Sequence, residues 1–154
     1  MIIQTRRFGK IEVADEKVLT MPAGLAGFPG RKRFVLLERE ETRPFCWFQS
    51  ADDPNLSLVV MNPLLFKPDY RVELKSAIKE MSWEGDRTED MAVYVVLTVN
   101  ENGPYRITAN LIGPIVINTG RREAVQLVLY DSRYSIQHPV MEQPQPPRQR
   151  AAAG

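Results

Sequence analysis

The sequence predicts a mainly β protein, a small single-domain antiparallel β-barrel or barrel-like sandwich with one short helix. Runs rich in β-branched and aromatic residues recur along the chain, and turn residues separate them at short intervals. A single segment has helical character. The 154 residues, of which 44% are hydrophobic, suffice for one domain with a buried core.

Strand-like runs fill the first half of the chain. The first two flank "RRFG", which is typical of a hairpin with Gly9 in its turn. Residues 22–30, "PAGLAGFPG", contain two prolines and three glycines and therefore predict a loop. We expect strands at 2–5, 10–14, 17–21, 33–39, 45–50 and 56–61, the last two joined by a turn at "ADDPN".

The second half contains further strand-like runs and the one helical segment. Residues 75–83, "KSAIKEMSW", contain helix-forming residues, with apolar positions at Ile78 and Met81. The residues "ENGP" at 101–104 are a strong turn signal between two strands. We expect strands at 70–74, 91–99, 105–111, 114–118 and 124–130.

The composition indicates a cytoplasmic protein made of one domain and a tail. A single cysteine cannot form an internal disulfide, which fits a reducing compartment. The N-terminus has no apolar run long enough for a signal peptide, and the longest apolar run, residues 91–97, is far too short to cross a membrane. We expect a domain at residues 1–138 and a disordered tail at 139–154, which holds four prolines and few large apolar side chains.

Neither the charge balance nor the reactive side chains indicate an enzyme or a metal site. Lysines and arginines number 20 against 19 acidic residues, which weakens the case for a dedicated nucleic-acid binder. The one histidine, His138, and the one cysteine, Cys46, are far apart and lack the spacing of metal ligands. Cys46 lies between Phe45 and Trp47, where burial raises the pKa of a thiol and makes it inert. We therefore expect no catalytic residues, no metal and no cofactor.

Polar residues inside otherwise apolar strands are more informative. Gln49 ends "FCWFQ", Thr108 and Asn110 lie within "ITANL", and Asn118 ends "PIVIN". Asparagine is depleted in strands, and a polar side chain buried without a partner costs stability. Each of these side chains therefore makes either an internal or an external hydrogen bond, and the sequence leaves both alternatives open.

Four segments, in this order, give the chain a close resemblance to a known family. They read "GLAGFPGRKRFVLLE", "PFCWFQSADDPNLSLVVMNP", "KPDY" and "ITANLIGPIVINTGRREAVQLVLYDSRYS". The chain resembles the flagellar assembly factor FliW family from about Phe8 to about Tyr134, with "WFQSADDP" and "TANLIGPIVIN" as the strongest signatures. Two positions depart from the family pattern. Phe48 stands in place of a leucine, and Pro29 in place of an acidic residue, which makes the loop ahead of Arg31 more basic.

The resemblance implies a β-barrel-like protein of the bacterial cytoplasm that is not an enzyme. Family members bind flagellin before its export, and they bind CsrA, a small dimeric repressor of flagellin translation. Flagellin that accumulates occupies the family member and frees CsrA, which stops further synthesis. On this resemblance we expect a monomer when free, with flagellin and CsrA as partners and no direct contact with nucleic acid or membrane. The candidate protein-binding residues are Gln49, Asp53, Tyr70, Thr108, Asn110 and Asn118.

Two alternatives to this function stay open. Trp47, Phe48 and Tyr105, together with the basic clusters "RRFGK" and "GRKR", fit a single-stranded nucleic-acid-binding barrel. A small-molecule barrel or an enzyme needs a large internal cavity, which filled strands such as 91–99 disfavour. One variant tests the role of Asn110, because replacing an external anchor by alanine weakens binding, whereas replacing a buried, satisfied group lowers the melting temperature.

Overall fold

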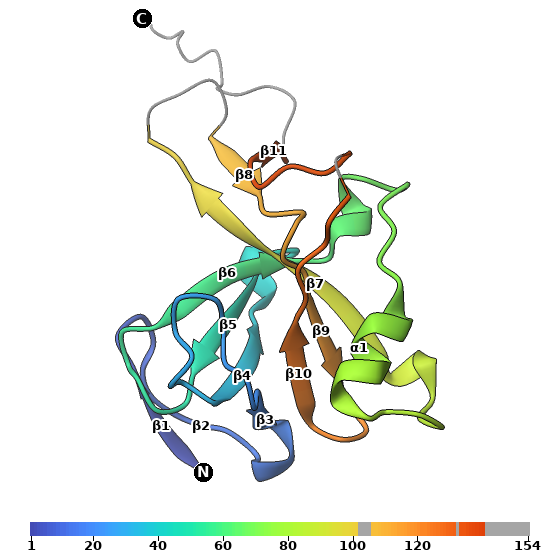
Figure 1. The fold of residues 1–154 in the computed structure, drawn as a ribbon. Helices are drawn as coiled ribbons and strands as arrows, with labels where there is room; N and C mark the ends of the chain where they lie inside the picture. The colour runs from blue at the N-terminus through green and yellow to red at the C-terminus, as the bar shows by residue number, and fades with distance from the viewer. Residues whose placement is uncertain (102–105, 132, 141–154) are drawn as a thin grey trace, which may run out of the picture.

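A computed structural model describes residues 1–101, 106–131 and 133–140 (Figure 1). These residues form one α-helix, α1 (Leu74–Met81), and eleven strands. The strands are β1 (Ile2–Thr5), β2 (Gly9–Glu12), β3 (Leu19–Thr20), β4 (Arg33–Glu38), β5 (Cys46–Ser50), β6 (Ser57–Met61), β7 (Met91–Val99), β8 (Ile107–Ala109), β9 (Ile115–Asn118), β10 (Glu123–Gln126) and β11 (His138–Pro139). Short 3-10 turns occupy Asp15–Lys17, Glu40–Thr42, Pro63–Leu65 and Thr88–Asp90. The prediction of a mainly β fold with one short helix is confirmed.

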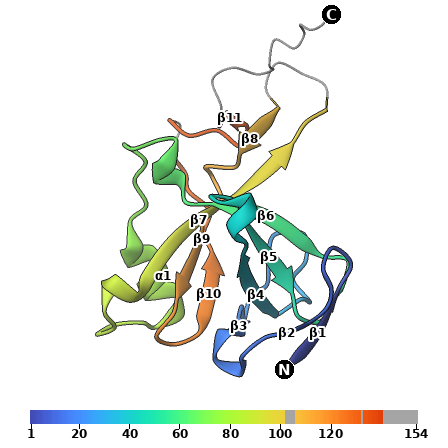
Figure 2. The same ribbon diagram turned by 180° about the vertical axis from the view of Figure 1, so that it is seen from behind.

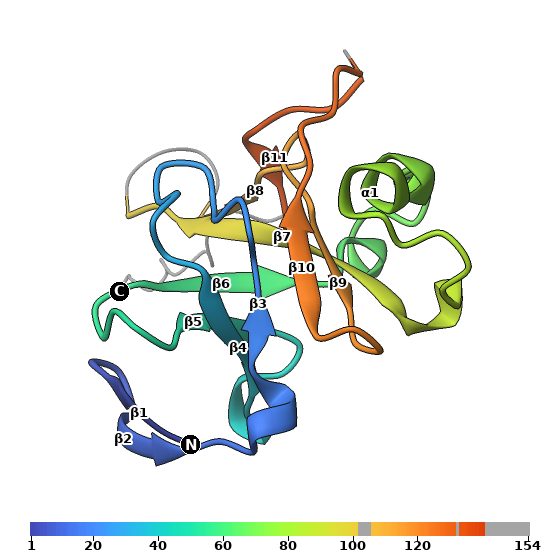
Figure 3. The same ribbon diagram turned by 60° about the horizontal axis from the view of Figure 1, so that its bottom comes forward.

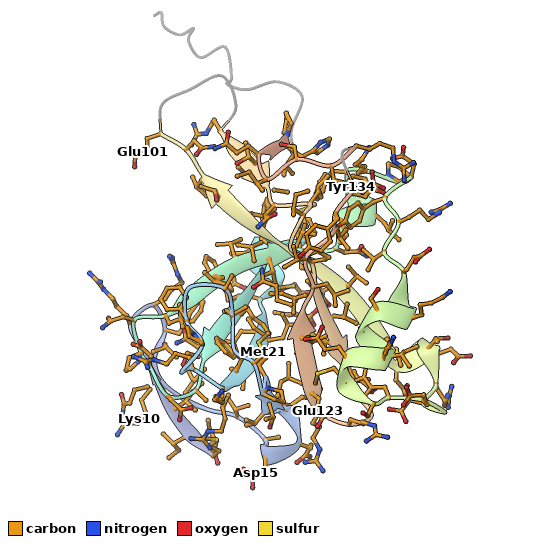
Figure 4. All side chains as sticks on the ribbon, viewed as in Figure 1. Lys10, Asp15, Met21, Glu101, Glu123 and Tyr134 are labelled. Carbon is orange, nitrogen blue, oxygen red and sulfur yellow. The ribbon has the colours of Figure 1, made fainter. Side chains whose placement is uncertain are left out.

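Seven strands close into a ring in the order β3, β4, β5, β6, β7, β9 and β10 (Figure 3). Neighbouring strands are antiparallel, except that β10 and β3 pair in parallel through Glu123 and Thr20. Large apolar side chains pack within the ring, where the Phe34 and Phe48 rings stack with centroids 4.7 Å apart and Met21 is fully buried (Figure 4). The predicted antiparallel barrel is therefore formed, and side chains occupy its interior.

The long strand β7 belongs to two parts of the molecule. Its residues 91–94 pair with β9, residues 95–97 pair with β6, and residues 97–99 pair with β8. Because β8 joins only the far end of β7, the β8–β11 pair projects beyond the ring (Figures 1 and 2). One strand thus connects the closed ring to this extension.

The extension contains the end of the described chain. Pro139 pairs with Thr108, and the Val140 N–H donates to the Ile107 carbonyl. The boundary expected at residue 138 therefore falls within β11. Residues 141–154 of the expected tail and most of the expected turn at 101–104 lie outside the described residues.

Two elements cover the outside of the ring. Strands β1 and β2 form the predicted hairpin, with Gly9 at φ +70°, and Ile3 packs against Val35 of β4. Helix α1 lies beside β9 and β10, and its Ala77 packs in one cluster with Val116 and Val125 (Figure 1). The N-terminal hairpin and the helix therefore bury different sides of the barrel.

The prediction of a strand at 70–74 is wrong. This segment pairs with no strand among the described residues and leads into α1. Its alternating pattern is nevertheless real, since Tyr70, Val72 and Leu74 all pack against the core clusters. A period of two shows which side chains are buried and does not by itself supply a partner strand. The strand predicted at 124–130 is also shorter than expected, because β10 ends at Gln126.

Candidate functional site

The loop at residues 22–30, between β3 and β4, lies between two turns that are distant in sequence (Figure 3). Its base closes where the Met21 N–H donates to the Lys32 carbonyl over 2.7 Å. Gly24 has φ +69°, and a Cβ there would lie 2.7 Å from the Phe28 carbonyl oxygen, so only glycine fits. We call residues 22–30, with the turns at 50–56 and 110–114 and the adjoining residues Gln126, Val128 and Ile136, the loop surface.

The turn at 50–56 is organised from inside by two polar side chains. The Ser50 hydroxyl accepts from the N–H groups of Asp52 and Asp53, over 3.1 and 2.9 Å. The Gln49 amide is completely buried and donates to the carbonyls of Ser50 and Leu56, over 3.0 and 3.2 Å. Gln49 thus holds the backbone of the turn in place, as expected for a buried amide.

Two ion pairs connect this turn to the end of the 22–30 loop. Arg31 Nε lies 3.1 Å from Asp53 Oδ2, and Arg33 Nε lies 3.2 Å from Asp52 Oδ2. A hydrogen bond from the Asn55 N–H, followed by the Arg31 guanidinium, lowers the pKa of the Asp53 carboxyl. These exposed pairs fix the geometry of the loop more than they stabilise the fold.

The turn at 110–114 meets the other side of the loop. Asn110 Oδ1 accepts from the N–H groups of Ile112 and Gly113, over 2.9 and 3.1 Å. The Gln126 side chain joins turn and loop, because its Oε1 accepts from the Ala26 N–H and its Nε2 donates to the Gly113 carbonyl, both over 2.9 Å. Asn110 and Gln126 therefore set how loop and turn face each other.

An apolar hollow of about 440 Å³ lies between this turn and the loop. Loop residues line one side, and Asn110, Ile112 and Gly113 line the other. Val128 and Ile136 on its rim are each 61% exposed, and Phe28 in the same loop is 44% exposed. Exposed apolar side chains next to oriented polar groups are typical of protein interfaces.

A family model described as "FliW protein" matches residues 2–140. The chain belongs to the FliW family. A flagellar assembly factor FliW of Syntrophus aciditrophicus (strain SB) is 40% identical over 142 residues, which cover 92% of this chain and 89% of that protein. One of Bacillus subtilis (strain 168) is 35% identical over 141 residues, which cover 91% of this chain and 96% of that protein. A crystal structure of the flagellar assembly factor FliW superimposes with a TM-score of 0.81 at 33% identity, and the match covers 93% of this chain and 99% of that chain.

In this FliW family member, the six predicted binding residues do not gather in one place. Two of them border the loop surface where a partner can reach them: the Asp53 carboxylate is 23% exposed, and Asn110 is half-buried. Gln49 lies beneath the same surface and is fully buried. Direct contact with a partner is therefore open to Asp53 and Asn110 in this conformation, and their role in binding stays a prediction.

The other three predicted residues make internal contacts. The Tyr70 hydroxyl donates to the Leu111 carbonyl over 2.7 Å, and burial raises the pKa of Tyr70. Thr108 is buried in β8, where its hydroxyl lies 3.5 Å from the Asn100 amide. In this structure the contact of the Thr108 hydroxyl is therefore internal. The Tyr70 hydroxyl supports the turn at 110–114 from inside the protein.

Asn118 lies at the opposite end of β9 from Asn110. Its Nδ2 donates to Asp86 Oδ2 over 3.0 Å, and its Oδ1 accepts from the Arg121 N–H over 3.2 Å. The Arg121 guanidinium binds the same Asp86 carboxylate and lowers the pKa of its carboxyl. This cluster connects the segment after α1 to the β9–β10 turn, so the contacts of Asn118 in this structure are structural.

Trp47 and Phe48, two of the three aromatic residues invoked for nucleic-acid stacking, are covered by other side chains. The Arg7 guanidinium covers the Trp47 ring, 4.2 Å from its centroid, and the Phe8 ring contacts Trp47 edge-on. Phe48 is fully buried inside the barrel. Tyr105 lies outside the described residues. Base stacking needs an accessible ring face, so this arrangement weakens the nucleic-acid alternative.

Cys46 is not an activated thiol. Burial, and then the Glu38 carboxylate, raises the pKa of the Cys46 thiol to about 11, so the thiol is protonated at neutral pH. Within residues 1–101, 106–131 and 133–140, no group of histidine, cysteine, aspartate or glutamate side chains is arranged to hold a metal ion. In the same ranges, no helix is long and apolar enough to span a membrane.

Sequence reasoning missed four residues of the loop surface. Phe28, Val128 and Ile136 are apolar, and sequence alone does not separate an exposed apolar residue from a core one. Gln126 carried a usable signal, because it interrupts the apolar run "AVQLVLY" as Asn110 interrupts "ITANL".

Proposed function

We propose that this protein acts in flagellar assembly by binding flagellin and the translational regulator CsrA in the cytoplasm, without catalysing a reaction. Membership of the FliW family supports the flagellar role, since the similar proteins reported above are flagellar assembly factors. The observation that carries the binding role is the loop surface, where exposed apolar side chains stand beside polar groups held in fixed directions.

The loop surface provides the two components of a protein interface. Phe28, Val128 and Ile136 offer an apolar centre, and burial of such side chains supplies most of the binding free energy. Asp53 and Asn110 offer polar anchors at its border. The buried residues Gln49, Tyr70, Thr108 and Asn118 affect binding indirectly, by holding the backbone beneath or away from this surface.

Coupling of flagellin synthesis to export follows from mass action. When one protein binds two ligands and each lowers the affinity for the other, the free concentrations of both ligands set its occupancy. Flagellin that accumulates in the cytoplasm then occupies the protein and releases CsrA, which represses flagellin translation. Export of flagellin reverses the exchange.

The test is a sizing-column experiment with the purified protein, flagellin and CsrA of the same organism. We expect each partner to co-elute with the protein at micromolar concentration, and flagellin added to the CsrA complex to displace CsrA. Phe28→Glu should abolish co-elution, because it places a charge in the apolar centre, whereas Ile2→Glu, on a still more exposed apolar residue of the N-terminal hairpin, should not.

Two results would count against the proposal. Failure of both partners to co-elute with the wild-type protein removes the function. Tight RNA binding by the protein alone, with a steep salt dependence, favours the single-stranded nucleic-acid alternative.

A further inference from the structure

The strand β7 carries an open half-edge that is separate from the loop surface. On the side of β7 that faces β6, only residues 95–97 are paired. Residues 91–94 pair on the opposite side, with β9. The ring is therefore closed, yet one stretch of β7 has no neighbouring strand on its β6 side within the described residues.

The register shows which backbone groups this half-edge presents. The Asp90 carbonyl accepts from the Thr119 N–H and the Val96 carbonyl accepts from the Asn110 N–H, so even-numbered residues of β7 direct their backbone groups toward β9 and β8. Odd-numbered residues therefore direct their backbone N–H and carbonyl groups toward the β6 side. The Met91 N–H donates to the Thr88 carbonyl.

Three backbone groups remain on this edge: the Met91 carbonyl and both the N–H and the carbonyl of Val93. None has a hydrogen-bond partner among the described residues. A residue with both groups free on one side is ready to exchange two hydrogen bonds with a single residue of an added antiparallel strand.

The sequence explains why β6 does not fill this place. Its register pairs Met61 with Val95, so Pro63 would stand opposite Val93. Proline has no N–H to donate to the Val93 carbonyl. Asn62 also turns the chain away, because its Oδ1 accepts from the Leu64 N–H and begins a 3-10 turn.

A groove of about 350 Å³ runs along the open half-edge. Residues 91–94 line it along β7, and the rest of its lining consists of Asn62, Pro63, Leu64, Tyr70, Arg71, Val72 and Leu74. Leu64 and its neighbour Leu65 are 50% and 58% exposed, which is unusual for adjacent leucines without a partner. Arg71 is exposed and is the only charged side chain in the lining.

We infer that this groove binds an extended segment of a partner protein, which adds to β7 as a short antiparallel strand opposite Val93. The occupant has an apolar side chain between Val72 and Leu74, and a carboxylate that pairs with Arg71. Backbone hydrogen bonds give such complexes affinity, and side-chain pockets give them specificity. The inference goes beyond the proposed function and does not rest on it.

The shape of the groove favours a single extended segment over a second copy of this chain. The free backbone groups of Val93 have Pro63–Leu64 and the segment 70–74 beside them. The same edge of a second copy has the same flanking segments, which would collide before the two strands approach to pairing distance. A single extended segment has no flanking segments of its own, so it can approach β7 to the distance of about 5 Å that separates paired strands.

The first test is selection of short peptides from a random phage-displayed library on the immobilised protein. We expect the recovered peptides to alternate apolar residues and to carry a carboxylate. A recovered peptide is then synthesised and titrated by fluorescence anisotropy against wild type, Val93→Pro, Val93→Ile and Arg71→Glu. Proline at position 93 removes an outward N–H on an unpaired edge, where strands tolerate proline, and it also replaces a side chain that packs against the core clusters.

We expect Val93→Pro to weaken peptide binding by at least about tenfold and Val93→Ile by less than about threefold, because isoleucine keeps the N–H and the apolar side chain. Arg71→Glu should weaken it severalfold, with the melting temperature unchanged. The Val93 amide, followed by NMR hydrogen exchange, should gain protection when the peptide binds, while the Tyr94 amide, which faces β9, should not change.

Several results would overturn the inference: no recovered peptide, equal binding by Val93→Pro and wild type, or unchanged exchange of the Val93 amide in the complex. Sedimentation that shows self-association abolished by Val93→Pro would assign the groove to a second copy instead. If Val93→Pro does not fold, as judged by circular dichroism, the Arg71→Glu titration and the Val93 amide of the wild-type protein decide the question.

Discussion

The two turns that flank the 22–30 loop are held in different ways. At 50–56 the organising side chain, Gln49, is fully buried, and the outer surface of the turn is tied to the loop by ion pairs. At 110–114 the organising side chain, Asn110, is half-buried, and neutral hydrogen bonds through Gln126 connect the turn to the loop. The side chain that organises the first turn lies in the core, and the side chain that organises the second lies at the surface.

This difference separates stability from recognition. A side chain that hydrogen-bonds backbone inside the core is out of a partner's reach, so its loss is felt in folding. A side chain that shapes a half-exposed turn contributes less to folding and more to the surface that a partner meets. Substitutions at Gln49, Asn110, Gln126 and Asp53 should therefore have progressively smaller effects on stability.

The largest effect is expected at Gln49. Gln49→Glu places a carboxylate among carbonyl oxygens at a fully buried position, and we expect a loss of about 3 kcal/mol or more in the free energy of unfolding at neutral pH. Urea unfolding followed by circular dichroism measures it. A loss below about 1 kcal/mol would mean that the turn is not built around this side chain.

A smaller effect is expected at Asn110. Asn110→Ala removes the acceptor for two backbone N–H groups in a half-buried turn, so the free energy of unfolding should fall by about 1–2 kcal/mol. Binding of flagellin or CsrA should weaken at the same time. Asn110→Asp is the matched control, because it keeps the acceptor and should retain most of the stability. Loss of stability with unchanged partner affinity would place Asn110 with Gln49 as a purely structural residue.

Gln126→Ala should change dynamics more than stability. We expect the free energy of unfolding to fall by about 1 kcal/mol or less, because the Ala26 N–H is exposed and water replaces the lost acceptor. Hydrogen exchange of the Ala26 amide should accelerate, and partner binding should weaken because the loop is no longer preorganised. Unchanged exchange at Ala26 would show that other contacts hold the loop.

The smallest effect is expected at Asp53 and depends on pH. Its folded pKa lies below the ordinary value of 3.8, so the ionised carboxylate stabilises the fold above that pH, and this contribution is lost as the pH falls through the folded pKa. Asp53→Asn should therefore differ slightly from wild type at neutral pH and converge with it in acid. Thermal melts across the acid range measure the convergence. A difference that grows in acid contradicts the assignment.

Sequence patterns predicted most strands because alternation and turn residues are local properties. They left a closed barrel and a barrel-like sandwich as alternatives, because closure depends on Thr20 of β3 meeting Glu123 of β10, and no local pattern records such a contact. The error at 70–74 has the same origin. Tyr70, Val72 and Leu74 face core clusters as strand residues do, yet their backbone has no partner strand among the described residues.

The candidate site was predictable to a similar extent. Unusual polar residues in apolar strands led to Asn110 and Gln49, and the sequence could not show that one faces a surface and the other the core. Whether a polar side chain points to the core or to the surface is decided by the position of neighbouring strands and not by residue type. Exposed apolar residues such as Phe28 gave no signal, because exposure is a property of the folded chain.

The single parallel contact between β3 and β10 also bears on when the barrel forms. Thr20 and Arg122, which are joined by a 2.9 Å hydrogen bond, lie near the beginning and near the end of the described chain. The β4–β5 and β5–β6 hairpins form over short loops, whereas this contact closes a very long one, which is entropically costly and slow. During synthesis on the ribosome, the ring therefore stays open until β10 has emerged. We expect β3 to dock last and to detach first when the barrel is pulled apart.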